Sequence, residues 1–304
     1  MSAHPGTDAL NANATIGRWN PRIQARRLVG RVWQGLFFGA TATAIGLLGM
    51  LIWSLVEPGW GWLSWHLVSD MPSRTPEIAG MNSAIWGSIW IVIGAAAFSF
   101  VIGLGTAIFI EEYAPQNRFT AFVQTNISNL AGVPSIVYGL LGLALFVQWL
   151  NMGRSISAGA LTMGLLILPV VVIASQEAIR AVPLGLRQAS YGLGATKWQT
   201  VRSHVLPTAM PGILTGMILS MSRAIGETAP LVVVGASSLV LTRPDGPLSG
   251  FTAMPVQIYN WSARPQREFE NLTAASIIVL MIILLSMNAF AIVLRQRLSK
   301  RNRM

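Results

Sequence analysis

Long apolar runs separated by polar segments set the pattern of this chain. A transmembrane helix needs about 20 apolar residues to cross a bilayer core of ~30 Å. Six runs approach or exceed that length, at residues 32–56, 83–110, 120–150, 158–175, 209–241 and 272–294. We therefore predict an all-α membrane protein with six transmembrane helices. The transmembrane domain covers residues 32–294, between a polar, basic segment at 1–31 and a basic tail at 295–304.

The third and fifth runs are irregular. Gly132 and Pro134 interrupt the third run, and polar side chains such as Asn129 precede them. As one helix the fifth run would reach ~50 Å, which is more than the ~30 Å core. It contains Gly226 and Pro230, so we predict that the helix breaks there. Broken helices at bilayer depth line protein or water, and transporters use them to build binding sites.

Polarity alone predicts the connecting segments. Residues 57–82 suit an interfacial loop because they combine Trp, Pro and Gly, and residues 242–271 indicate a second polar loop. Glu111 and Glu112 end the second run, where we expect them to be solvated. Residues 176–207 are polar but compatible with short helices. Composition favours a solvated loop there over an element that docks a soluble partner.

Composition agrees with a polytopic membrane protein. Of the 304 residues, 53% are hydrophobic and 11% are charged, against roughly 25% charged residues in soluble domains. The chain has no Cys, which excludes disulfides and Cys-ligated metals. The three His residues lie far apart in the sequence, which argues against a His-based metal cluster.

The net charge of +10 is explained by membrane topology rather than by nucleic-acid binding. Ten basic residues flank the two ends of the transmembrane domain, and five more lie in the segments after the second and fourth spans. Five lie on the opposite side, at Arg74, Arg154, Arg243, Arg264 and Arg267. Basic residues concentrate in cytoplasmic loops. We therefore predict that both termini are cytoplasmic.

Arg223 and Glu227 are the only charges between residues 209 and 241. A charge at bilayer depth costs from ~3 to more than ~10 kcal/mol and marks a functional-site candidate. At helical spacing Ser220 and Gly216 share their face. Arg carries a planar five-donor fork that suits oxyanions. An anion site and a structural ion pair between helices both remain open on these residues alone.

A resemblance to ABC-importer permeases rests first on the segment LRQASYGLGATKWQTVRSHVLP, residues 186–207. It is similar to the EAA loop of that family. Gln188, Ala189 and Ser190 take the triplet, Gly194 takes the glycine, and Leu-Pro closes the pattern. The sequence departs from the pattern in two places, since Gln188 replaces an acidic residue and His204 replaces an aliphatic one.

Four further segments narrow the resemblance to phosphate-specific permeases of the PstA type. They are FIEEYAP at 109–115, GVPSIVYGLLG at 132–142, RAIGETAPL at 223–231 and PVQIYNWSARPQREF at 255–269. The resemblance covers the chain from about residue 80 onward. It implies the type I ABC importer permease fold in the inner membrane of a bacterium. It also implies a paired PstC-type permease, a PstB-type ATPase dimer that holds ATP and Mg²⁺, and a periplasmic PstS-type phosphate-binding protein.

The resemblance also implies site residues. In the family the Arg and Glu of the RAIGE core are associated with phosphate passage, which points to Arg223 and Glu227. The expected substrate pathway therefore consists of Arg223, Glu227, Ser220, Thr228, Ser135 and Asn129. The expected ATPase-coupling residues are Gln188, Ala189, Ser190, Gly194, Ala195 and Lys197.

The chain itself is not expected to hydrolyse ATP or to hold a cofactor. A P-loop needs the pattern G-x-x-x-x-G-K-[ST], and neither Lys197 nor Lys300 stands in it. Energy must then come from a separate ATPase docked near residues 191–203. A permease for another oxyanion is the alternative, and an ion-coupled secondary transporter is a third possibility. An intramembrane enzyme finds no supporting motif in the sequence.

Overall fold

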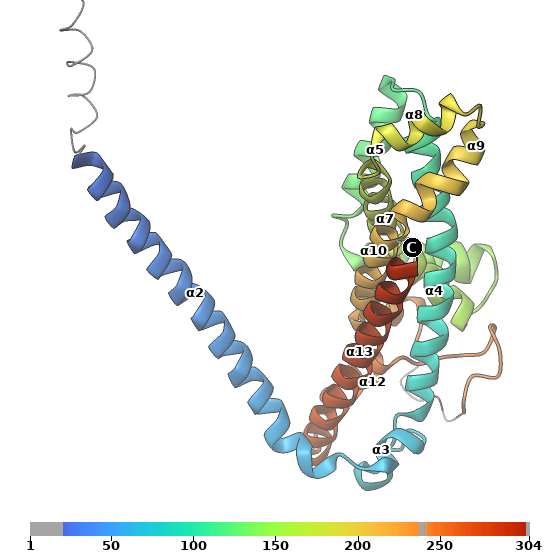
Figure 1. The fold of residues 1–304 in the computed structure, drawn as a ribbon. Helices are drawn as coiled ribbons and strands as arrows, with labels where there is room; N and C mark the ends of the chain where they lie inside the picture. Colours follow the sequence, from blue (N-terminus) through green and yellow to red (C-terminus); the bar gives the residue numbers. More distant parts are fainter. Residues whose placement is uncertain (1–20, 237–239, 241, 302–304) are drawn as a thin grey trace, which may run out of the picture. The chain divides into compact units, whose positions relative to one another are not determined.

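The computed structural model describes residues 21–236, 240 and 242–301 of the chain (Figure 1). Regular structure within these residues is helical throughout. The chain divides into a first unit that ends at Ser54 and a second unit from Leu55 to Met304.

The first unit consists of most of helix α2, Pro21–Gly59. Residues 26–62 form a continuous apolar helical stretch that is long enough to cross a membrane, which agrees with the predicted first span. The helix begins inside the segment predicted at 1–31, while residues 1–20 of that segment lie outside the described part of the chain. Apolar helix formers without an internal break explain its length, since Pro58 is the single proline after its first residue and lies in its last turn.

Four long helices form the framework of the second unit. They are α4 (Asn82–Ile108), α7 (Ile156–Arg180), α10 (Leu206–Gly226) and α13 (Arg267–Arg301). Small residues let α7 pack closely against its neighbours. A Cβ added at Gly94 of α4 would lie 2.8 Å from the Cβ of Ala160, and one added at Gly212 of α10 would lie 2.8 Å from the Cβ of Ala178. One turn along α10, a Cβ at Gly216 would overlap the Cβ of Ala174. Gly212 and Gly216 therefore let α10 lie close to α7.

The interruption of the third run is also confirmed. Helix α5 (Arg118–Leu130) and helix α6 (Ser135–Gly142), with its extension η4 (Leu143–Trp149), meet at an angle of 102°. Pro134 starts the second helix, and the Tyr138 hydroxyl donates a 2.8 Å hydrogen bond to the carbonyl of Leu130 across the bend. The described residues contain five helices long enough to span a membrane, or six spans when this bent pair counts as one.

The fifth run breaks where the sequence predicts. Helix α10 ends at Gly226, Glu227 is extended with φ −79° and ψ 123°, and helix α11 covers Ala229–Val234. Pro230 lies in the first turn of α11, a position that proline tolerates because no intrahelical donor is needed there. Gly235 ends this helix with a φ of 107°, a conformation that favours glycine.

Two segments predicted as loops contain short helices, so those predictions are wrong. The first holds η1 (Trp60–Trp62), α3 (Trp65–Ser69) and η2 (Pro76–Ile78), and the second holds α12 (Met254–Ser262). Leu67 from α3 and Trp261 from α12 are each only 1% exposed and belong to one hydrophobic cluster with α13. Average polarity missed α3 and α12 because Leu67 and Trp261 are large buried apolar residues among polar neighbours.

The segment at 176–207 forms a helical hairpin. It contains α8 (Leu184–Gly192), α9 (Lys197–Thr200) and the π turn η5 (Val201–Val205). Helix α7 continues into the segment as far as Arg180, and a continuous helical stretch runs from Lys197 to Gly226. Figure 1 shows α8 and α9 at one end of the second unit and α3 at the opposite end.

Candidate functional site

Arg223 and Glu227 flank the helix break. The Nε of Arg223 lies 3.7 Å from Oε1 of Glu227, which is an ion-pair distance but too long for a hydrogen bond. The Arg223 side chain is 54% exposed and that of Glu227 is 22% exposed. Because Glu227 has left the helix, it neutralises Arg223 only in part and leaves the guanidinium accessible to an anion.

Ser220 lies apart from this accessible pair. Its side chain is buried, and its hydroxyl donates a 2.9 Å hydrogen bond to the carbonyl of Gly216, on the α10 face that packs against α7. Arg223 instead shares an exposed stripe with Leu219 and Gly226. The structure thus splits the predicted stripe into a packed part and an accessible part.

The other predicted pathway residues belong to the two helix breaks. Thr228 is half-buried just before α11, Ser135 is half-buried at the first position of α6, and Asn129 is exposed near the end of α5. The helices that follow the breaks pack together, since a Cβ added at Gly139 of α6 would lie 2.8 Å from the Cα of Pro230.

One hydrophobic cluster joins the two breaks. Val133, beside the first break, packs against the cluster that contains Ala224 and Leu231, on either side of the second break. The structure therefore brings the GVPS and GETAP segments into one region, as expected of a site built from discontinuous helices.

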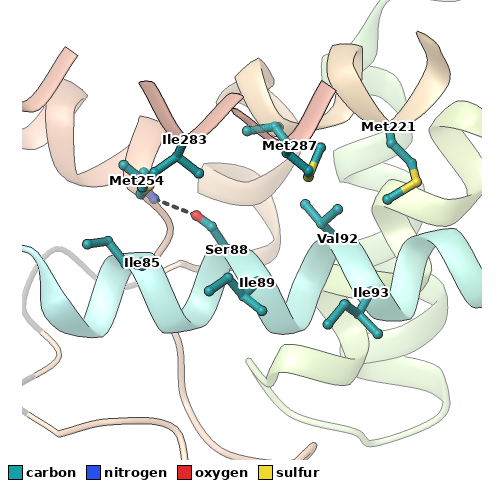
Figure 2. A pocket seen from close by; sticks show the side chains of 10 residues that line it. Ile85, Ser88, Ile89, Val92, Ile93, Met221, Met254, Ile283 and Met287 are labelled. Atoms are coloured by element: carbon teal, nitrogen blue, oxygen red, sulfur yellow. Dashed lines mark hydrogen bonds between the residues drawn. The ribbon is translucent and has the colours of Figure 1, made fainter. Parts of the chain in front are cut away.

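A separate pocket of about 200 Å³ lies on another face of α10 (Figure 2). Figure 2 shows Val92 of α4 opposite Met287 of α13 and Met221 of α10. Ser88 alone among its lining residues has a polar side chain, and its hydroxyl accepts a 2.9 Å hydrogen bond from the backbone N–H of Met254. An anion would find no charge to compensate its desolvation there, so this pocket is not a phosphate site.

The α8–α9 hairpin, residues 184–200, is held together internally. The hydroxyls of Ser190 and Thr200 are 2.8 Å apart and buried. Gly194 turns the chain with a φ of 83°, and Thr196 caps α9 through a reciprocal capping box with Gln199.

The hairpin presents several predicted coupling residues on its surface. Gln188, Ala189, Gly194 and Lys197 are exposed, whereas Ser190 is buried and Ala195 is half-buried. Leu193 is 90% exposed and Leu184 is 71% exposed. An exposed apolar rim of this kind is typical of an interaction surface.

Glu111 and Glu112 are ion-paired rather than solvated, so that expectation is wrong. Glu111 accepts hydrogen bonds of 2.9 and 2.7 Å from Nε and Nη2 of Arg180. Glu112 accepts bonds of 3.2 and 2.9 Å from Nε and Nη2 of Arg187. Sequence reasoning assigned no role to Arg187. The acidic pair at the end of the second run and the basic residues in the segment 176–207 could together have predicted ion pairs between these two parts of the chain.

Known proteins resemble this chain in sequence. The model of the family described as binding-protein-dependent transport system inner membrane component matches residues 99–304. The chain belongs to that family. Its relative in Mycobacterium tuberculosis, phosphate transport system permease protein PstA 1, is 33% identical over all of this chain and 99% of its own length. The PstA protein of Haemophilus influenzae is 29% identical over 89% of this chain and 95% of its own. The PstA-type resemblance is confirmed.

The fold is that of a known importer permease. A chain of a bacterial alginate ABC transporter, crystallised with an alginate pentasaccharide-bound periplasmic protein, superposes with a TM-score of 0.66. The match covers 90% of this chain and 98% of that chain at 16% identity. The predicted fold class of the family is therefore confirmed, and the protein is a multi-pass membrane protein.

Proposed function

We propose that this chain is one permease subunit of an ATP-driven importer of inorganic phosphate. The observation that carries the proposal is the full-length similarity to PstA proteins in a chain that exposes Arg223 at a helix break. Phosphate suits this site because a guanidinium donates two parallel hydrogen bonds to a tetrahedral oxyanion. Glu227 keeps that binding weak enough for release, since a conduction site must also let its ion leave.

Inside a membrane, the exposed stripe of α10 must be shielded from lipid by another protein surface. Arg223, Leu219 and Gly226 lie on it together, and a guanidinium facing lipid would be costly. A homologous PstC-type permease is the partner proposed for this face, so that phosphate passes between the two subunits. Thr228, Ser135 and Asn129 would line the same passage from the two helix breaks.

The α8–α9 hairpin is the proposed docking element for a PstB-type ATPase dimer, which would bind ATP and Mg²⁺. A periplasmic PstS-type protein would deliver phosphate on the opposite side. Basic residues flank the hairpin and both chain ends, which supports cytoplasmic termini in a bacterial inner membrane. In this arrangement the chain binds its partner subunits and conducts phosphate, and it catalyses no reaction itself.

Substrate competition tests the proposed function. The chain would be co-expressed with a PstC-type permease, a PstB-type ATPase and a PstS-type binding protein from the same organism. Uptake of labelled phosphate would be measured in cells that lack other phosphate importers. We expect uptake that depends on ATP and is displaced by unlabelled phosphate. Displacement by sulfate or molybdate instead would assign the chain to another oxyanion. Uptake that follows an ion gradient without the ATPase would indicate a secondary transporter.

Changing Leu193 to Asp should release the ATPase. Leu193 is 90% exposed at the hairpin turn, and a charge placed in an apolar contact must be desolvated without a partner. We expect at least a tenfold loss of the ATPase subunit that co-purifies with the tagged permease. Leu248 is also largely exposed but lies on the other side of the predicted topology, so Leu248→Asp serves as the matched control. Equal ATPase recovery with both variants would place the docking surface elsewhere.

A further inference from the structure

Three consecutive residues at the end of α4 each contact a different cation. They lie in the π turn η3, Phe109–Tyr113, which continues α4. Glu111 contacts Arg180 of α7 at 2.7 Å, and Glu112 contacts Arg187 of α8 at 2.9 Å. Lys197, the first residue of α9, lies 5.1 Å from the ring centroid of Tyr113. The turn thus contacts α7, α8 and α9 in chain order.

The central contact is buried and fully engaged. The side chains of Glu112 and Arg187 are only 6% and 14% exposed. Besides its two bonds to Glu112, Arg187 donates from Nη1 to the carbonyl of Val182 at 2.7 Å and from Nη2 to the carbonyl of Ile179 at 2.9 Å. One guanidinium therefore ties α4, the end of α7 and α8 together, through bonds that a shorter or more flexible cation cannot all replace.

The π turn directs these three side chains toward different helices. The N–H of Ala114 donates to the carbonyl of Phe109 at 2.8 Å, which closes a wider turn than an α-helix makes. A wider turn holds one more residue, so successive side chains reach different neighbours. Single π turns occur frequently at functional sites.

We propose that η3 is the joint through which movement of the α8–α9 hairpin is passed to α4, with Glu112 and Arg187 as its positioning residues. Helix α10 receives the same movement through the backbone, because it is continuous with α9. Helix α4 has no direct backbone link to the hairpin. Its end packs in an apolar cluster with Leu186 of α8 and Val205 of η5, and the ionic contacts at η3 add hydrogen bonds of fixed direction to that packing. Its far end carries Ser88, which bonds to Met254 of α12, so displacement at η3 reaches the opposite side of the unit. The inference rests on the proposed ATP-driven function.

The first test is the ratio of phosphate transported to ATP hydrolysed by the complete transporter in proteoliposomes. Arg187→Lys keeps the charge but loses most of the bonds, and Glu112→Gln keeps an acceptor without the charge. In both variants we expect the ratio to fall at least fivefold while ATP hydrolysis stays within twofold of the unmodified complex. The control is Glu177→Gln, because Glu177 is 67% exposed and contacts only Arg180, at 3.2 Å. A ratio unchanged in both variants would overturn the proposal.

The second test needs no phosphate. The chain has no Cys, so Gly105→Cys in α4 and Gly185→Cys in α8 can each carry a spin label, and neither position has a neighbour within 4 Å of an added Cβ. We expect a narrow label-to-label distance distribution that keeps its width when ATP is added to the complex. Arg187→Lys should broaden it. An identical distribution in Arg187→Lys would overturn the proposal. A narrow distribution in a complex that hydrolyses ATP but does not transport phosphate would keep the joint and reject only the proposed substrate.

A third variant tests the proposal if the first two variants do not fold. If Arg187→Lys and Glu112→Gln do not reach the membrane, Lys197→Ala removes the exposed cation over Tyr113 and leaves the buried pair intact. The proposal then expects about a twofold fall in the transport ratio and a broader distance distribution. No change in either measurement would assign the η3 contacts to folding alone and reject the joint.

Discussion

Replacing Arg223 by Gln is expected to lower phosphate uptake about ten- to a hundredfold. A hydrogen bond to a charged group contributes ~1.5–3 kcal/mol, and each ~1.4 kcal/mol corresponds to a factor of ten in rate. The Arg223 side chain is 54% exposed, so the shorter glutamine leaves no cavity in the packed core and assembly should be normal. Initial rates of labelled phosphate uptake, normalised to the amount of assembled complex in the membrane, measure the effect.

Two further variants distinguish direct contact between Arg223 and phosphate from the effect of the positive charge of Arg223 alone. Arg223→Lys keeps the positive charge but loses the planar fork, so uptake near the unmodified rate would mean that charge alone is needed. Arg118→Gln removes another exposed arginine and should leave uptake unchanged. If Arg223→Gln transports phosphate at the unmodified rate in a normally assembled complex, Arg223 has no role in passage.

Replacing Gly216 by Ala is expected to destabilise the permease by ~1–3 kcal/mol, the usual cost of overpacking a close contact. A Cβ at this position overlaps the Cβ of Ala174 in α7, which is a methyl carbon attached directly to the backbone and cannot rotate away. The two helices must then separate or shift. Thermal unfolding of the detergent-solubilised chain should show a lower midpoint, and its amount in the membrane should fall.

A compensating change identifies the cause. Ala174→Gly removes the obstructing methyl group, so the Gly216→Ala/Ala174→Gly pair should recover most of the lost stability. Gly105→Ala is the matched control because nothing lies within 4 Å of its added Cβ. Equal destabilisation by Gly105→Ala, or no recovery in the double variant, would trace the effect to something other than the α7–α10 contact.

Hydropathy and the position of Gly and Pro were enough to predict the long helices and both breaks. The break after Gly226 and the bend at Pro134 are local backbone consequences of residue type, so a single sequence contains them. The buried helices α3 and α12 were missed because they are short. Leu67 acquires its environment from α13, which lies far along the sequence, and Trp261 packs on Phe269 across the turn between α12 and α13, so neither contact falls within one helical period.

The candidate site was predictable in type but not in geometry. A charge inside an apolar run marks Arg223, whatever the fold. Helical spacing alone placed Ser220 beside it, but packing against α7 takes Ser220 out of the accessible surface. The contact between Glu112 and Arg187 joins residues 75 positions apart. Only the packing of α4 and α7 fixes that separation in space, so no local pattern specifies this pair.

The unbroken helix from Lys197 to Gly226 is 30 residues long, so a small tilt at one end displaces the other end by a large distance. At ~1.5 Å per residue it measures about 45 Å, so a tilt of about 10° around its Lys197 end would sweep Gly226 through about 8 Å. That arc exceeds the ~3 Å reach of a hydrogen bond. Since α7 is packed along the same helix, the two would swing as one body. A modest rotation at the hairpin would therefore suffice to carry Arg223 into and out of reach of an anion, without any change in its own conformation.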